Sequence, residues 1–249
     1  MTAAFRIETE GVVARVTLSR PEVRNALRPG ELHALAEALS RLGADSAVQL
    51  IVLTGEGTSA FCAGLDLKDR AAMLAELEGE GPTGLGAVLR AARSLRPPIL
   101  GRVNGACVAG GLGLLSACFH SVAAGTAVFA LPEVRVGLFP HVVLAGWRDR
   151  VSPGALDRMA ASGDPANAEE ARGLGLIDEV VAPEALDAAV RQAARRMLER
   201  PGVPPRPDDF ERRLREAEER TRAHHRSRIE DIGQETGPLD TARHGRTRP

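Results

Sequence analysis

The sequence has very few aromatic side chains. Only 3% of its 249 residues are aromatic, tyrosine is absent, and Trp147 is the single tryptophan. A core must therefore be built mainly from the aliphatic residues within the 44% apolar content. Proteins that bind single-stranded nucleic acid stack the bases on aromatic rings, so this mode of recognition is disfavoured.

An excess of one charge and a long apolar run are lacking too. The formal net charge is −1, and acidic and basic residues are mixed along the chain, so no field attracts nucleic acid or an anionic membrane surface. No apolar run reaches the roughly 18 residues of a membrane span, and no charged-then-apolar leader begins at Met1. We expect a soluble, cytoplasmic protein that binds neither nucleic acid nor membrane.

Cysteine and lysine are scarce. The three cysteines, Cys62, Cys107 and Cys118, lie in apolar contexts without metal-ligand spacing, which indicates buried thiols in a reducing compartment and predicts no metal site. Lys68 is the only lysine, because 31 of the 32 basic residues are arginine. A compact ammonium is not equivalent to a planar guanidinium. A ligand contact by Lys68 and a solvated charge at the start of a helix are equally good interpretations.

Strand and helix patterns alternate over residues 1–200. Short apolar or β-branched runs predict strands, and apolar residues at helical spacing predict helices between them. The predicted strands are 5–8, 12–18, 48–53, 99–103, 128–131 and 178–181, and the predicted helices are 29–42, 84–95 and 107–118. The last helix is apolar on all sides, as a fully buried helix would be. This order indicates an α/β domain with a buried sheet.

The composition changes after Glu199. Four prolines between residues 201 and 207 form a break, and a highly charged helix is predicted over 208–232. Its apolar residues are few, namely Phe210, Leu214, Ala217 and Ile229. Such a helix cannot fold alone, so it should lie against the core or a neighbouring subunit. We predict a core domain of residues 1–200 and a helical appendage of 201–249 whose end is frayed from about residue 233.

Two glycine turns are candidates for binding an oxygen atom. One is Ala63-Gly64-Leu65-Asp66, which follows a strand-like segment, and the other is 109–113, which opens the buried helix. Free backbone N–H groups at such turns can form an oxyanion hole, which suits a thioester whose α-carbon becomes enolate-like. The pattern is weak alone, because small-residue packing also selects glycine. The second turn does not fit a P-loop, because no Gly-Lys-Ser/Thr follows it. It does not fit the dinucleotide-binding fingerprint either, because Ser116 occupies the place of the third glycine.

Seven blocks of the sequence follow one another at characteristic spacings. They are Arg20-Pro-Glu-Val-Arg-Asn-Ala-Leu27, Thr54-Gly55, Phe61-Cys-Ala-Gly-Leu-Asp-Leu67, Val103-Asn-Gly105 with Ala109-Gly-Gly111, Leu131-Pro-Glu-Val134, Gly137-Leu-Phe-Pro140, and Ala168-Glu-Glu-Ala171 to Gly175-Leu-Ile-Asp178. In this order and spacing they resemble the enoyl-CoA hydratase/isomerase (crotonase) family, and the resemblance covers roughly residues 5–200.

This resemblance implies a ββα-spiral core and an assembly of three chains or of two such trimers. It also implies an acyl-CoA substrate whose thioester carbonyl lies between the backbone amides of Leu65 and Gly110. Coenzyme A is then part of the substrate, and no permanently bound cofactor is expected. By the same resemblance the CoA moiety contacts a set of residues on the first and third blocks, namely Arg24, Ala26, Leu27, Ala63 and Lys68.

The sequence departs from the family at one catalytic position. Family hydratases hold the water that adds across the double bond between two glutamates. Glu133 matches the second of them, but Gly113 stands at the place of the first. A general acid or base contributes ~10²–10⁴-fold to a rate. Ordinary hydration is therefore in doubt, while stabilisation of an enolate is not affected.

Three interpretations of the chemistry stay open. Glu133 alone could move a double bond between positions 3 and 2 of the acyl chain, as similar family isomerases do. His141, which lies where other family members carry a reactive carboxylate, could add an acid or base, although an apolar-site replacement is the more common reason for such a histidine. The third interpretation is a family member that binds acyl-CoA without catalysis and keeps Glu133 as a structural carboxylate.

Two further features have structural explanations. Asp66 is expected to cap a helix that begins near Leu67. His224 and His225 are adjacent on the predicted tail helix and so face different ways, which argues against a shared metal site.

Overall fold

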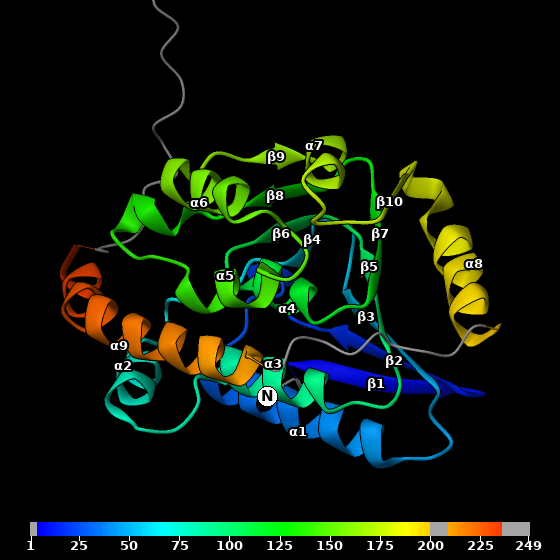
Figure 1. Cartoon of the computed structure of the whole chain (residues 1–249), viewed down its shortest axis with the longest axis horizontal. Coiled ribbons are helices and arrows are strands. Elements are labelled where there is room, and N and C mark those ends of the chain that lie inside the picture. The colour runs from blue at the N-terminus through cyan, green and yellow to red at the C-terminus, as the bar shows by residue number, and fades with distance from the viewer. Residues whose placement is uncertain (1–3, 200–208, 236–249) are drawn as a thin grey trace, which may run out of the picture.

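The computed structural model describes residues 4–199 and 209–235, and in it the chain forms two β-sheets surrounded by helices (Figure 1). The larger sheet has the order β1-β2-β3-β5-β7-β10, with β1 antiparallel to β2 and the others parallel. Its strands are β1 Phe5–Glu10, β2 Val13–Leu18, β3 Leu50–Gly55, β5 Ile99–Val103, β7 His120–Ala124 and β10 Glu179–Val181. The smaller sheet is β4 Ala60–Cys62, β6 Ala106–Val108, β8 Val128–Ala130 and β9 Ala166–Asn167.

The inner strands of the larger sheet are buried on both faces, whereas the edge strand β1 is mostly exposed. In β3, Leu50 and Val52 belong to one hydrophobic cluster, and Ile51 and Leu53 belong to the other. Successive side chains of a strand point to opposite faces, so a continuous apolar run marks a strand covered on both sides. One face packs on α8 (Leu186–Glu199), and the other contributes to the main core. The predicted α/β class with a buried sheet is confirmed.

The chain repeats a strand–strand–helix unit. β3 is followed by β4 and then α2 (Arg70–Glu78), and β5 is followed by β6 and then α4 (Gly110–Ser116). The prediction of one helix over 107–118 is therefore wrong at its start. A short apolar run suits either element, and pairing of Cys107 with Cys62 in β4 and with Phe129 in β8 decides for a strand.

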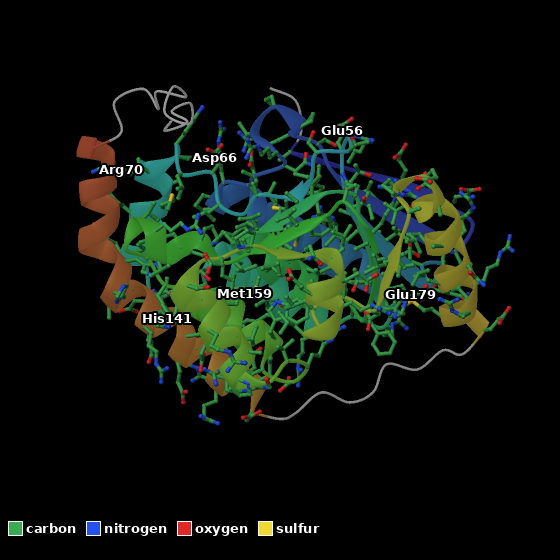
Figure 2. All side chains as sticks on the ribbon, turned by 90° about the horizontal axis from the view of Figure 1, so that it is seen from above. Glu56, Asp66, Arg70, His141, Met159 and Glu179 are labelled. Carbon is green, nitrogen blue, oxygen red and sulfur yellow. The ribbon has the colours of Figure 1, made fainter. Side chains whose placement is uncertain are left out.

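The helices that complete the fold lie on the outside of the two sheets and between them. They are α1 Pro29–Ala44, α3 Gly84–Arg93, α5 His141–Trp147, α6 Pro153–Ser162 and α7 Ala168–Gly173, with single 3₁₀ turns at η1 Pro21–Val23, η2 Pro132–Val136 and η3 Pro183–Ala185. Figure 2 shows Asp66 and His141 toward one end of the molecule and Glu179, beside α8, toward the other. The glycine turns and Glu133 line one pocket together with His141.

The C-terminal helix α9 (Phe210–Glu235) packs against α2, α3 and α5 of its own chain (Figure 1). Phe210, Leu214 and Ala217 are buried, as their spacing predicts, whereas the side chain of Ile229 lies outside the described part. The Arg93 guanidinium lies 4.5 Å from the centre of the Phe210 ring, in a cation–π contact. The helix ends at Glu235, beyond the residue 233 at which fraying is predicted to begin. The predicted domain boundary at residue 200 and the last residues, 236–249, lie outside the described part of the chain.

A buried carboxylate also anchors α9. Glu218 is only 2% exposed and accepts hydrogen bonds from the backbone and the hydroxyl of Thr83 at 2.8 and 3.1 Å. Both terminal nitrogens of Arg90 donate to the same carboxylate, at 3.1 and 2.8 Å. Bidentate Arg–carboxylate pairs combine charge with fixed geometry. Glu218 therefore ties α9 to the first turn and the middle of α3.

Candidate active site

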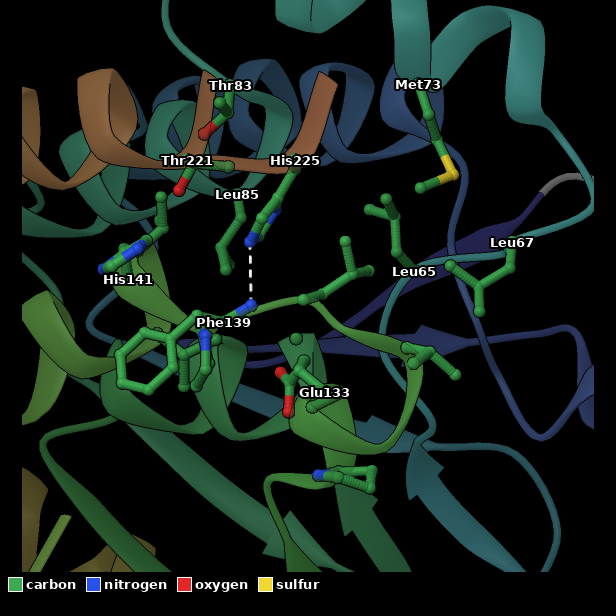
Figure 3. Close-up of a pocket in the computed structure, with 18 of the residues that line it drawn as sticks. Leu65, Leu67, Met73, Thr83, Leu85, Glu133, Phe139, His141, Thr221 and His225 are labelled. Carbon is green, nitrogen blue, oxygen red and sulfur yellow. Dashed lines mark hydrogen bonds between the residues drawn. The ribbon is translucent and has the colours of Figure 1, made fainter. Parts of the chain in front are cut away.

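A pocket of about 470 Å³ opens between the two glycine turns, η2 and α9 (Figure 3). Its wall comes from residues 63–67, α2, the start of α3, residues 108–110, residues 132–143 and two side chains of α9. Most of these side chains are aliphatic. Concave apolar pockets with a few polar groups are the usual form of a small-molecule site.

The two glycine turns approach each other at the pocket wall. Gly64 has φ +94°, and a methyl group added there would lie 2.8 Å from the Gly110 nitrogen, so the turn requires glycine. Ala109, just before Gly110, also has a positive φ of 53°. Within the described residues, neither the Leu65 N–H nor the Gly110 N–H donates to a protein acceptor. Two free amides thus lie on adjacent turns that line one pocket.

The first turn is held by the segment around Ala26. The Leu27 N–H donates to the Gly64 carbonyl at 2.9 Å, and the Asp66 N–H donates back to the Leu27 carbonyl at 2.9 Å. Arg20 donates to the Ala26 carbonyl at 2.9 Å and to the Asp66 carboxylate at 2.8 Å. The conformation of Leu65 is therefore fixed from two sides.

The residues that the resemblance assigns to CoA lie around this turn in different settings. Ala63 lines the pocket, and its N–H donates to the Arg24 carbonyl at 3.0 Å. Ala26 and Leu27 are buried, with their backbone groups bonded within the protein. Arg24 and Lys68 are exposed outside the pocket. Their role in binding CoA stays a prediction.

The expected cap at Asp66 is wrong in position. The helix that follows, α2, begins at Arg70 and is preceded by Asp69. Asp66 is 6% exposed, accepts the Lys68 N–H at 3.2 Å in a local turn and forms an ion pair with Arg20. Side chains of aspartate often bond the backbone two residues ahead, which competes with capping.

Glu133 is the carboxylate that projects into the pocket from η2 (Figure 3). Its Oε2 is buried and has no hydrogen-bond partner among the described residues. Burial raises the pKa of Glu133 to about 7, because the charged form is desolvated. Such a group can accept and return a proton near neutral pH.

Gly113 lies behind the side chain of Leu85. A methyl group added at Gly113 would lie 2.6 Å from the Leu85 Cδ2, and Leu85 lines the pocket. The space into which a residue 113 side chain would extend is thus filled by an apolar group from α3. Sequence patterns gave no sign of this contact, because it joins elements that are apart in the chain.

His141 lies at the start of α5 and lines the pocket. Its ring packs 4.7 Å from the Phe139 ring and about 6 Å from both His224 and His225, measured between ring centres. Burial, followed by the charges of His224 and Arg220, lowers the pKa of His141. In Figure 3, His141 and Leu65 lie on opposite sides of Glu133.

Two pocket residues on α9, Thr221 and His225, were not predicted. His225 is 8% exposed and accepts the Phe139 N–H at 2.8 Å. They continue the buried stripe of Phe210, Leu214 and Ala217 at steps of four residues, so helical periodicity could have found them. His224 is exposed, which agrees with the expectation that the adjacent histidines face different ways. The described residues hold no cluster suited to a metal ion, and none of their helices is long and apolar enough to cross a membrane.

The two-sheet fold with a C-terminal helix and the sequence motifs point to the same family as the comparisons with known proteins. The sequence profile of the enoyl-CoA hydratase/isomerase family matches residues 8–236, and the chain belongs to this, the crotonase, family. It is 32% identical over 200 residues to a crotonyl-CoA hydratase from Syntrophomonas wolfei, covering 77% of this chain and 74% of that one. It is 34% identical to an (E)-benzylidenesuccinyl-CoA hydratase from Thauera aromatica, covering 77% and 75%.

Solved structures agree with the fold. The structure of an enoyl-CoA hydratase from Mycobacterium smegmatis superposes with a TM-score of 0.70 at 30% identity, covering 93% of this chain and 88% of that one. The crotonase-like spiral core with a C-terminal helix is thus confirmed, as is the family that the sequence motifs indicate.

Proposed function

We propose that this protein moves the double bond of an acyl-CoA from position 3 to position 2, with Glu133 as the only acid and base. The observation that carries the proposal is the buried Oε2 of Glu133, which has no partner among the described residues, in a pocket where Leu85 fills the space beside Gly113. Isomerisation needs one group that removes a proton and returns it. Hydration in this family needs a second carboxylate, and Gly113 offers none.

The mechanism follows from the two turns and the carboxylate. With the thioester oxygen between the Leu65 and Gly110 amides, negative charge that develops on this oxygen is stabilised by two N–H donors. The ionised Glu133 removes a proton from C2 of the 3-enoyl group, and a dienolate forms. The protonated Glu133 then delivers the proton to C4, which leaves the double bond between C2 and C3. A pKa near 7 suits both steps.

A purely structural Glu133, as in a non-catalytic acyl-CoA-binding protein, is less well supported. Structural carboxylates inside proteins are normally hydrogen-bonded, because an unpaired buried polar group is costly. Glu218 of this chain is an example, with donors from Thr83 and Arg90. Glu133 Oε2 has no such partner.

The experiment compares turnover of 3-enoyl-CoA and hydration of 2-enoyl-CoA by the wild type, Glu133→Gln and Glu76→Gln. Glu76 is the second carboxylate that lines the pocket, but its Oε1 already accepts the Gly84 N–H at 2.5 Å. We expect isomerisation to exceed hydration, and Glu133→Gln to lower it by ~10²–10⁴-fold. An equal loss in Glu76→Gln would show that Glu133 does not act alone. If neither substrate reacts but acyl-CoA still binds, the non-catalytic alternative is correct.

The CoA contacts and the assembly are proposed separately. Arg24 and Lys68 are exposed beside the first glycine turn, where their charges can meet phosphate groups. Lys68→Ala should raise KM and leave kcat unchanged, while a KM that does not move would make Lys68 a solvated charge. Light scattering of the purified protein tests the trimer or dimer of trimers that the family implies.

A further inference from the structure

Two imidazole rings line the pocket. They belong to His141 from α5 and His225 from α9, with ring centres 6.2 Å apart and planes inclined by 27°. In Figure 3, His141 lies on the opposite side of the view from Leu65, and His225 lies between them. The His141 side of the pocket is therefore the side away from the first glycine turn, where the thioester would lie.

The hydrogen bond to Phe139 fixes the tautomer of His225. Its Nε2 accepts the Phe139 N–H at 2.8 Å, so this nitrogen carries no proton, and a neutral ring must be protonated on Nδ1. Among the described residues, no acceptor bonds this Nδ1–H. His225 is more than nine-tenths buried. The Nδ1 atom itself is not fully buried, so a ligand or water can reach it and satisfy this donor.

The His141 ring also lacks a protein partner, although this side chain is only partly buried. Neither of its ring nitrogens has a hydrogen-bond partner in the described part of the chain. Burial, which lowers the pKa of His141, also lowers that of His225 to about 4, so both rings are neutral at pH 7. The Thr221 hydroxyl donates to the Ala217 carbonyl at 2.9 Å, and no described residue accepts a hydrogen bond from either ring. The two rings that line the pocket therefore each keep an N–H donor for a ligand or water.

We propose that His141 and His225 form a polar subsite that hydrogen-bonds an uncharged oxygen, a hydroxyl or a ketone, on the part of the acyl group remote from the thioester. This inference rests on the proposed function, because it requires the acyl group of a CoA thioester to occupy the pocket. Neutral imidazoles satisfy a neutral oxygen by donating their N–H groups, without the cost of moving a charged carboxylate out of water. The preferred substrate is then an oxygenated enoyl-CoA rather than a plain aliphatic one.

The test measures binding of saturated thioesters by calorimetry, since these are not turned over. A series from butanoyl-CoA to decanoyl-CoA is compared with its ω-hydroxy counterparts and with the carboxyl-ended adipoyl-CoA. At the chain length that reaches the histidines, the hydroxy thioester should bind about fivefold to tenfold more tightly than the methyl-ended one. Equal affinities at every length, or tightest binding of adipoyl-CoA, would overturn the subsite.

Variants assign the effect to the two rings. His141→Leu and His225→Leu should each reduce the preference for the hydroxy thioester, and the double variant should abolish it. His225→Gln should retain it, because an amide can accept the Phe139 N–H and still donate. His224→Leu, at the neighbouring exposed position, is the matched control and should keep the wild-type ratio. A preference that survives the double variant contradicts the assignment.

Misfolding and failure of the proposed function are distinguished in the same experiment. His141→Leu loses no hydrogen bond within the described protein, so it reports on the subsite if His225→Leu does not fold. If thioesters bind but the methyl-ended, hydroxy and carboxyl-ended compounds have equal affinities, only the subsite is wrong. If no thioester binds at all, the proposed function fails, and the subsite fails with it.

Discussion

Glu133→Gln should stabilise the protein at alkaline pH while it abolishes activity. The substitution keeps the shape of the protonated side chain and removes its ability to ionise. Burial raises the pKa of Glu133 from an ordinary 4.5 to about 7, so the folded chain binds this proton more tightly than the unfolded chain does. Ionisation of Glu133 therefore opposes folding.

The size and pH range of the effect follow from the two pKa values. Below pH 4.5 the carboxyl is protonated in both states, and the cost of ionisation is absent. The cost grows as the pH rises and is fully present above about 7, where it amounts to about 3 kcal/mol at about 1.4 kcal/mol per pH unit. For a chain of this size, ~3 kcal/mol corresponds to a difference in Tm of roughly 6–12 °C.

The assay is thermal unfolding of the wild type and Glu133→Gln at about pH 4 and about pH 8.5. The two Tm values should nearly coincide at the acidic pH and differ, with the variant higher, at the alkaline pH. Comparison across pH removes any constant cost of the buried amide. A Tm difference between the variant and the wild type that does not grow from the acidic to the alkaline pH would refute the reasoning, because Glu133 would then be ionised without a burial cost.

Three other predictions concern the rate, the glycine turn and α9. With 3-enoyl-CoA as substrate, kcat/KM should fall about tenfold for each pH unit below about pH 7, because Glu133 must be ionised to remove the C2 proton. A kcat/KM that stays constant between about pH 5 and 8 would exclude Glu133 as the base. Gly64→Ala should abolish turnover, because the new methyl group would lie 2.8 Å from the Gly110 nitrogen. The control is Gly57→Ala, at a glycine with φ +76° and no atom within 4 Å of the added methyl group. This variant should lose about 1–2 kcal/mol of stability and keep its kcat. Equal kcat in both variants would show that the close approach of the turns is irrelevant. Arg90→Leu should lower the free energy of unfolding by about 3–5 kcal/mol in urea titrations, because Glu218 would stay buried without its cation. The exposed Arg215→Leu is the control, and a similar small effect in both would mean that the Glu218 pair does not anchor α9.

Local patterns predicted the elements whose signals are local. The run at 99–103 coincides with β5, and the helix stripe of Leu32, Leu35 and Leu39 faces the core within α1. The strand predicted at 48–53 is observed at Leu50–Gly55, because pairing with β2 continues through Thr54. The apolar start of the run at 107–118 is a strand for the same reason: partners elsewhere in the chain decide its structure.

The candidate site was predictable only where motifs carry it. The glycine turns and Glu133 stand in recognisable blocks, and the structure brings them to one pocket. Leu85 and His225 stand in no recognisable block, although the helical spacing of α9 places His225 on its buried face. The contact of His225 with Phe139 joins residues 86 positions apart, and burial of the charged Glu218 depends on donors from α3. No composition or periodicity in α9 specifies these long-range partners.

The most direct test of a single-carboxylate pocket follows a labelled proton. 3-Enoyl-CoA carrying deuterium at C2 is incubated with the protein in ordinary water, and the products are identified by NMR. We predict 2-enoyl-CoA with part of the deuterium at C4, because one buried carboxyl takes the label and returns it before it exchanges with water. A 3-hydroxyacyl-CoA as the main product, or no reaction of a bound thioester, would contradict the account.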